Sequence, residues 1–99
     1  MKLWIDDIRK APEGYERVHS VSAAIAFIHW IESTEETLEL IDIDHDAGFY
    51  ARDGGDYIKL LDWLEQTGRN YPIRIHSMNP VGVENMRRII QKNGWTEVR

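Results

Sequence analysis

Side chains of the kinds that carry chemistry follow three separate apolar runs of the sequence. In chain order they are Asp6, Asp7, Asp44, His45, Asp46, His76, Ser77 and Asn79. Carboxylates brought close together repel one another unless a hard divalent cation or a shared proton relieves the charge. Imidazoles titrate near neutral pH, so two histidines beside a phosphate could act as general base and general acid. The residue types therefore indicate metal-assisted chemistry on a phosphate ester.

The aspartates favour a divalent cation site. The candidate ligands are Asp6, Asp7, Asp44 and Asp46. Their oxygens suit Mg²⁺ or Mn²⁺, the cofactors we expect, and a set that also included His45 or His76 would suit Fe²⁺ or Zn²⁺. Purely structural roles remain open. Asp7 could cap a turn, Asp46 could begin an Asx-turn, and either histidine could simply hydrogen-bond a neighbouring carboxylate.

A phosphate site is expected beside these residues. Asn79 is a good N-cap and Pro80 suits the first position of a helix, whose free N–H groups and dipole could bind phosphate with Ser77. Gly82 would let a ligand approach the first turn closely, and Arg9 could bind phosphate at the rim. The alternative is that the Asn-Pro-x-Gly segment only caps a helix. Ser77 as a nucleophile has little support, because no Gly-x-Ser-x-Gly turn is present.

Strands and helices that alternate along the chain would position these residues. Expected strands cover residues 2–6, 15–19, 38–43, 73–75 and 95–98, and expected helices cover residues 21–32, 56–67 and 80–93. This alternation predicts an α/β domain with a mostly parallel sheet of about five strands and three helices, covered on both faces. The carboxyl ends of parallel strands share one edge, where ligands bind. All of the candidate residues above would meet there.

The connection between the first two expected strands is unusually short. A parallel crossover normally needs a dozen or more residues and a helix. Residues 7–14 offer less than that. Either the crossover is an extended loop, or the second strand is irregular or antiparallel.

Composition limits the class of protein. With 99 residues we expect a single domain, residues 1–99. The formal net charge of −5 has the wrong sign for binding duplex DNA and suits a small phosphorylated ligand or a metal ion better. No cysteine is present, which excludes disulfides and leaves the cytoplasm as the default compartment. The first apolar run is too short for a signal peptide or a membrane span.

The chain also resembles a known family. An acidic pair after the first strand, an Asp after the third and a Ser after the fourth are similar to the receiver domain of response regulators, a flavodoxin-like fold. Residues 3–14 (Leu-Trp-Ile-Asp-Asp-Ile-Arg-Lys-Ala-Pro-Glu-Gly), 44–46 (Asp-His-Asp) and 76–86 (His-Ser-Met-Asn-Pro-Val-Gly-Val-Glu-Asn-Met) resemble more closely the cyclic-phosphate processing receiver domain. The resemblance implies a metal-binding pair at Asp6 and Asp7, a phosphoacceptor position at Asp44, and a link to RNA repair.

Two departures from ordinary receivers argue against phosphorelay signalling. The segment between the first two expected strands is too short for the first helix of a receiver domain, and no Lys-Pro pair follows the last expected strand. Our first hypothesis is therefore metal-assisted hydrolysis of a cyclic phosphate, such as a 2′,3′-cyclic nucleotide or RNA end, with Asp44, His45, His76 and Ser77 as catalytic residues. The alternatives are a receiver-like signalling module phosphorylated on Asp44, which would recruit a protein partner, and a non-catalytic sensor of cyclic phosphate.

Overall fold

The structure is a computed structural model that describes residues 1–99. Its elements are β1 (Lys2–Ile5), β2 (Tyr15–Val18), α1 (Val21–Glu32), β3 (Leu40–Ile43), the 3-10 helix η1 (Gly48–Arg52), α2 (Ile58–Gln66), β4 (Ile73–Ile75), α3 (Pro80–Asn93) and β5 (Glu97–Val98). Every expected strand and helix is present, and the ends differ from expectation by at most about two residues. Strand β3 begins only at Leu40 because its neighbour β1 begins at Lys2, with which Leu40 pairs.

Helices α1 and α3 each begin at a side-chain cap, and the cap of α3 is the predicted Asn79. The Ser20 hydroxyl accepts a hydrogen bond from the Ala23 N–H, and Asn79 Oδ1 accepts one from the Gly82 N–H, both at 3.0 Å. Helix α3 is followed by Gly94 at a φ of 67°, a left-handed conformation that glycine adopts readily. None of the helices combines the length and the hydrophobicity that a membrane span requires.

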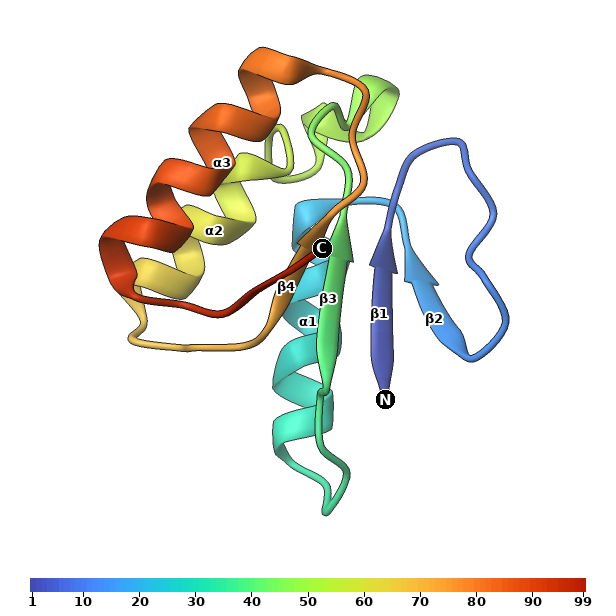
Figure 1. The fold of residues 1–99 in the computed structure, drawn as a ribbon. Coiled ribbons are helices and arrows are strands. Elements are labelled where there is room, and N and C mark those ends of the chain that lie inside the picture. The colour runs from blue at the N-terminus through green and yellow to red at the C-terminus, as the bar shows by residue number, and fades with distance from the viewer.

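The strands form one fully parallel sheet in the order β2-β1-β3-β4-β5 (Figure 1). This is the strand order of flavodoxin-like α/β domains. In register, Ile5 pairs with Val18 on one side and with Ile43 on the other, and Ile43 pairs with Ile75. Because these strands end level with one another, the residues that follow them share one edge of the sheet.

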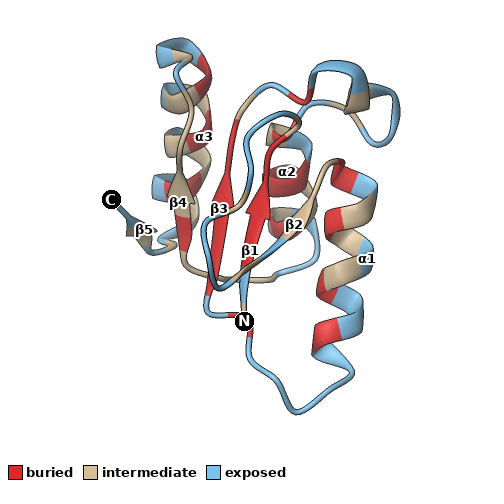
Figure 2. Cartoon of the chain, turned by 90° about the vertical axis from the view of Figure 1, so that its right-hand side faces the viewer, coloured by how far each residue is buried: buried red, intermediate tan, exposed pale blue.

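All three helices lie on the same face of the sheet. Helix α1 contacts α2 and α2 contacts α3, and in Figure 2 the helices lie behind the strands. The shared core is built from Leu3, Ile5, Ile41, Ile43 and Ile73 of the strands and from helix residues that include Ile28, Leu61 and Met86. The sequence predicts a sheet covered on both faces, and β3 is indeed buried throughout, but no helix covers the second face. The opposite face carries Trp4, Asp42 and Arg74, and the β1–β2 connection has no helix to place there.

The β1–β2 connection is the extended loop that the sequence left as one of two possibilities. Residues 6–14 cross the helix-free face and return to a parallel β2 (Figure 2). The Asp6 carboxylate holds the first turn by accepting hydrogen bonds from the Ile8 and Arg9 N–H groups, each at 2.8 Å. The Trp4 indole N–H then donates to the Arg9 carbonyl at 3.2 Å. These bonds fasten the loop over the sheet without a helix.

Candidate functional site

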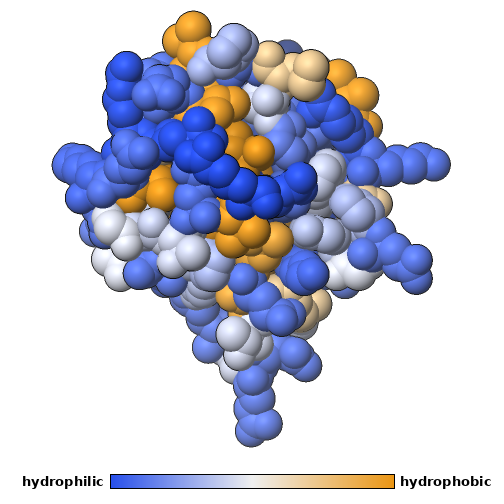
Figure 3. Space-filling model, in the orientation of Figure 1, coloured by the Kyte–Doolittle hydropathy of each residue, from blue (hydrophilic) through white to orange (hydrophobic).

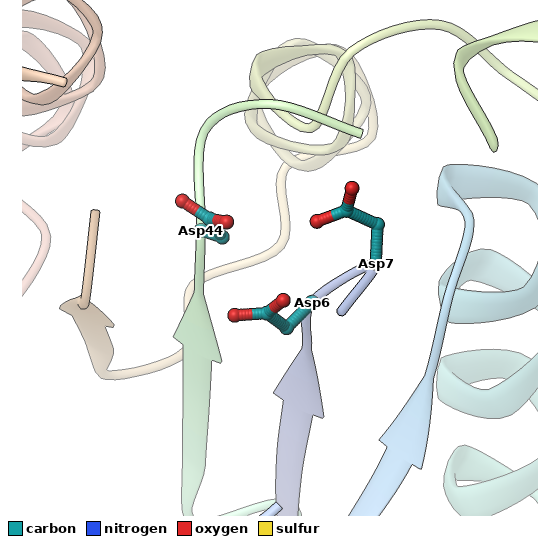
Figure 4. A group of neighbouring side chains, drawn as sticks. All are labelled: Asp6, Asp7 and Asp44. Carbon is teal, nitrogen blue, oxygen red and sulfur yellow. The ribbon is translucent and has the colours of Figure 1, made fainter. Parts of the chain in front are cut away.

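Three carboxylates meet at the carboxyl ends of β1 and β3. Asp6 and Asp7 follow β1, Asp44 follows β3, and one oxygen from each lies within 4.8 Å of the others (Figure 4). The register of Ile5 with Ile43 places Asp6 directly beside Asp44. The structure confirms that these three residues converge, as the sequence predicts. Asp46, the fourth candidate ligand, lies outside this group.

Asp6 is fully buried and held by four hydrogen bonds. Its Oδ1 accepts from the two backbone N–H groups of the loop turn, and its Oδ2 accepts from the Arg9 guanidinium at 3.1 Å and from His76 Nε2 at 3.0 Å. Burial alone would raise the pKa of Asp6. The bonds from the Arg9 and Ile8 backbone, from His76 and from the guanidinium outweigh burial, so this pKa lies below its usual value. Asp6 is therefore an anchored carboxylate.

Asp7 is in a different electrostatic situation. Burial, together with the negative charges of Asp6 and Asp44, raises its pKa, although its own backbone N–H opposes the shift. Its carboxylate rests against Gly48, which has a φ of 56°, and a Cβ on that glycine would lie 2.5 Å from Asp7 Oδ2. A side chain at position 48 would therefore displace the Asp7 carboxylate. The chain compensates the negative charge of Asp7 only in part.

The guanidinium of Arg9 supplies a positive charge beside the carboxylates. It is 3.1 Å from Asp6 Oδ2 and 3.4 Å from Asp44 Oδ2, and the Arg9 side chain is about half exposed. A cavity of about 110 Å³ is lined by Asp6, Asp7, Ile8, Arg9 and Asp44. Arg9 thus lines the cavity with a half-exposed side chain, and its contact with Asp44 is longer than its contact with Asp6.

The acidic cavity fits a hard divalent cation. Its donors are carboxylate oxygens, the ligands that Mg²⁺ and Mn²⁺ prefer. Three neighbouring carboxylates carry more negative charge than the single guanidinium of Arg9 offsets. Burial, together with the charges of Asp6 and Asp44, raises the pKa of Asp7, and a cation beside it would stabilise its charged form.

His76 is packed between two buried aspartates. Its Nε2 bonds Asp6 and its Nδ1 bonds Asp42 Oδ1 at 2.6 Å, while its ring stacks on Trp4 with centroids 3.8 Å apart and planes within 5°. Asp42 also accepts from Arg74 at 3.1 Å and from the Tyr15 hydroxyl at 3.3 Å. Both ring nitrogens are occupied and the side chain is 9% exposed, so His76 supports Asp6 from behind the cavity.

Sequence reasoning missed Asp42. Asp42 lies within the apolar run of residues 38–43, yet its carboxylate is fully buried at the centre of the sheet. A carboxylate in the middle of such a run is itself a signal, because a buried charge requires partners. Its partners, His76 and Arg74, lie on the next strand and beyond it.

His45 has surroundings unlike those of His76. Its ring packs on the first turn of α3, where a Cβ on Gly82 would lie 2.3 Å from the His45 Cγ atom. The close approach expected at Gly82 is therefore made by this imidazole. His45 Nδ1 bonds Asp46 Oδ1 at 2.8 Å, and Nε2 has no protein partner and is not buried. His45 thus has one ring nitrogen oriented by a carboxylate and the other open.

Ser77 and Asn79 shape the start of α3. Asn79 caps the helix through Gly82 and its Nδ2 lies 3.5 Å from Asp46 Oδ2, while the Ser77 hydroxyl oxygen accepts from the Asn79 N–H at 3.1 Å. The amides of Asn79 and Gly82 are therefore engaged within the chain. The Ser77 O–H remains free to donate, and Asp46 acts as a link between His45 and the α3 cap.

A parallel α/β sheet with an acidic pair after β1 and a further aspartate after β3 defines a receiver-like domain. Residues 1–92 match the family described as the cyclic-phosphate processing receiver domain, and the chain belongs to this family. A comparison with curated proteins gave no match, and a comparison with solved structures gave none either. The family description connects this domain with cyclic-phosphate processing.

Proposed function

We propose that this domain hydrolyses a cyclic phosphate with the help of a divalent cation. The observation that carries the proposal is the cavity formed by Asp6, Asp7 and Asp44 with Arg9 at its rim, in a chain of the cyclic-phosphate processing family. A 2′,3′-cyclic nucleotide or the cyclic end of an RNA is the substrate class that we favour.

The three aspartates would hold Mg²⁺ or Mn²⁺. Such a cation polarises a phosphoryl oxygen and lowers the pKa of bound water. His76 keeps Asp6 in place through its bond at 3.0 Å, and Asp42 keeps His76 in place through its bond at 2.6 Å. His76 is therefore a positioning residue in this proposal, which replaces the acid–base role expected from the sequence.

Arg9 and Ser77 would bind the non-bridging phosphate oxygens. Arg9 is half exposed and can exchange its weak bond to Asp44 for a charge-assisted bond to phosphate. Ser77 contributes its free O–H. The N-terminus of α3 contributes less than the sequence indicates, because the Asn79 and Gly82 amides are already engaged.

His45 is the residue suited to proton transfer. In the reaction a water oxygen bonds to phosphorus, one ring P–O bond breaks, and the departing oxygen takes a proton, which leaves a phosphate monoester and a free hydroxyl. The open Nε2 of His45 can accept the water proton and return it to the departing oxygen, while Asp46 orients the ring through Nδ1.

The test is hydrolysis of a panel of 2′,3′- and 3′,5′-cyclic nucleotides with Mg²⁺, with Mn²⁺ and with EDTA. We expect metal-dependent turnover that Asp44→Asn abolishes and His45→Ala lowers by roughly 100-fold or more, the usual range for general acid–base catalysis. His29→Ala, on the exposed face of α1, is the matched histidine control. Full turnover in both His45→Ala and His76→Ala would refute the mechanism.

Other outcomes would support the alternatives. Ligands that raise the melting temperature without being turned over would favour a sensor. A small-molecule phosphodonor that adds the mass of one phosphoryl group to the parent but not to Asp44→Asn would favour a signalling module.

A further inference from the structure

Exposed apolar side chains stand on the segments that leave the sheet at the edge where the acidic site lies. Six large hydrophobic residues of the chain are more than a third exposed, and four of them stand on loops or first turns that follow β1, β3 and β4. These four are Ile8, Phe49, Met78 and Val81. In Figure 3 hydrophobic residues stand at the upper end of the molecule, where Figure 1 places the segments that follow β3 and β4. Single exposed apolar residues are ordinary, but their concentration at one end marks a contact surface.

The cavity is small, so part of a ligand bound in it would extend over the exposed residues nearby. The cavity measures about 110 Å³, whereas pockets that enclose a whole drug-sized ligand start near roughly 300 Å³. A cation and a phosphoryl group fit inside. The organic part of a phosphate ester must then lie outside the cavity, against exposed residues nearby.

Phe49 is the one aromatic residue among these four, and its neighbours in the structure define its position. It follows Gly48, the glycine on which the Asp7 carboxylate rests, and it is 68% exposed. The Arg52 guanidinium lies 4.1 Å from the Phe49 ring centroid, and the Tyr50 ring meets Phe49 edge-on at 5.7 Å. The ring is thus supported by two neighbours while most of it stays open to a ligand.

We propose that Phe49 is a stacking platform for the nucleobase of a nucleotide whose phosphate lies in the acidic cavity. This inference rests on the proposed function and names the part of the substrate that the cavity cannot hold. Aromatic side chains stack on bases with little preference for sequence, because every base has a flat π face. Arg52 supports the platform through its cation–π contact with the ring.

The experiment compares nucleoside cyclic phosphates with a base-free substrate, glycerol 1,2-cyclic phosphate, in the presence of Mn²⁺. We expect Phe49→Ala to raise KM for the nucleotides roughly 5- to 150-fold, the range of base stacking, with kcat within about twofold. KM for the glycerol compound should not change, and Phe49→Tyr should restore the nucleotide KM. Trp30→Ala, an exposed aromatic on α1, is the control and should match the parent.

The outcomes separate this inference from the proposed function. An unchanged nucleotide KM in Phe49→Ala, or an equal loss on the glycerol compound, would overturn the platform and leave hydrolysis standing. If nothing is hydrolysed, the proposed function fails, and the same variants are compared by calorimetric binding of nucleoside 3′-monophosphates and glycerol phosphate. Selective loss of nucleotide binding in Phe49→Ala would still support the platform, and absent or unchanged binding would overturn it.

Discussion

Substitution of Asp42 by asparagine should strongly destabilise the protein. The Asp42 carboxylate is fully buried and accepts from His76, Arg74 and Tyr15 at 2.6, 3.1 and 3.3 Å. In Asp42→Asn one oxygen becomes an NH₂ group that faces a donor, and the negative charge between two basic side chains is lost. A buried polar group that loses its hydrogen-bond partner lowers the free energy of unfolding by about 1–3 kcal/mol, and a buried ion pair that loses one partner lowers it by about 3–5 kcal/mol. Because Arg74 is 44% exposed, water compensates part of its loss, and we expect about 2–3 kcal/mol.

Urea denaturation followed by circular dichroism would measure this change. For a domain of this size, a loss of about 2–3 kcal/mol lowers the melting temperature by roughly 8–24 °C. Asp53→Asn, at an exposed aspartate without a side-chain hydrogen bond, is the matched control and should stay within about 0.5 kcal/mol of the parent. If Asp42→Asn also stays within that range, the bonds of Asp42 do not anchor His76 and the reasoning is wrong.

Three further changes test other parts of the structure. Gly82→Ala should displace the His45 ring, since the new Cβ would lie 2.3 Å from the His45 Cγ atom. The NMR resonances of His45 should therefore shift. The stability gain of about 1 kcal/mol that is usual when alanine replaces glycine in a helix should be absent in a thermal melt. The hydrogen bond from Arg87 lowers the pKa of Glu97 in the folded state. The ionised Glu97 therefore stabilises the fold fully at pH values above 4.5, the ordinary pKa of the group, and this stabilisation is lost as the pH falls through the lower pKa of the folded state. The unfolding free energy of Arg87→Gln should therefore vary less over that acidic range than that of the parent, and equal pH profiles would contradict this. Asp7→Asn should raise the melting temperature in EDTA, because it removes a negative charge that burial and the neighbouring Asp6 and Asp44 disfavour. The same change should abolish the rise in melting temperature that Mn²⁺ gives the parent, and a similar Mn²⁺ effect in both proteins would exclude Asp7 as a ligand.

Most of the fold could be predicted from local sequence features. Ser20, Asn79 and Gly94 fix helix ends through bonds to residues within the same turn, and the spacing of apolar residues predicts which helix faces are buried. The convergence of Asp6 and Asp44 also followed from the sequence. Parallel strands bring their carboxyl ends to one edge whatever the details of packing.

The parts that sequence reasoning missed depend on distant partners. Successive apolar residues in β3 predict a sheet covered on both faces, but they do not say what covers each face. The helix-free face is instead closed by loop 6–14, which is fastened by Trp4 and by the Asp6 side chain. No local pattern distinguishes such a loop from an irregular or antiparallel connection.

The sequence by itself determined the elements, their order along the chain and the three aspartates at one edge of the sheet. Tertiary structure alone decided which histidine supports the site and which is open. His76 bonds Asp42 and Asp6, which are 34 and 70 positions away in the chain, whereas His45 turns onto α3 because Gly82 leaves room for its ring. The physical reason is that caps and periodicity are set by near neighbours, while the environment of a buried polar side chain is set by strand register and by packing between elements.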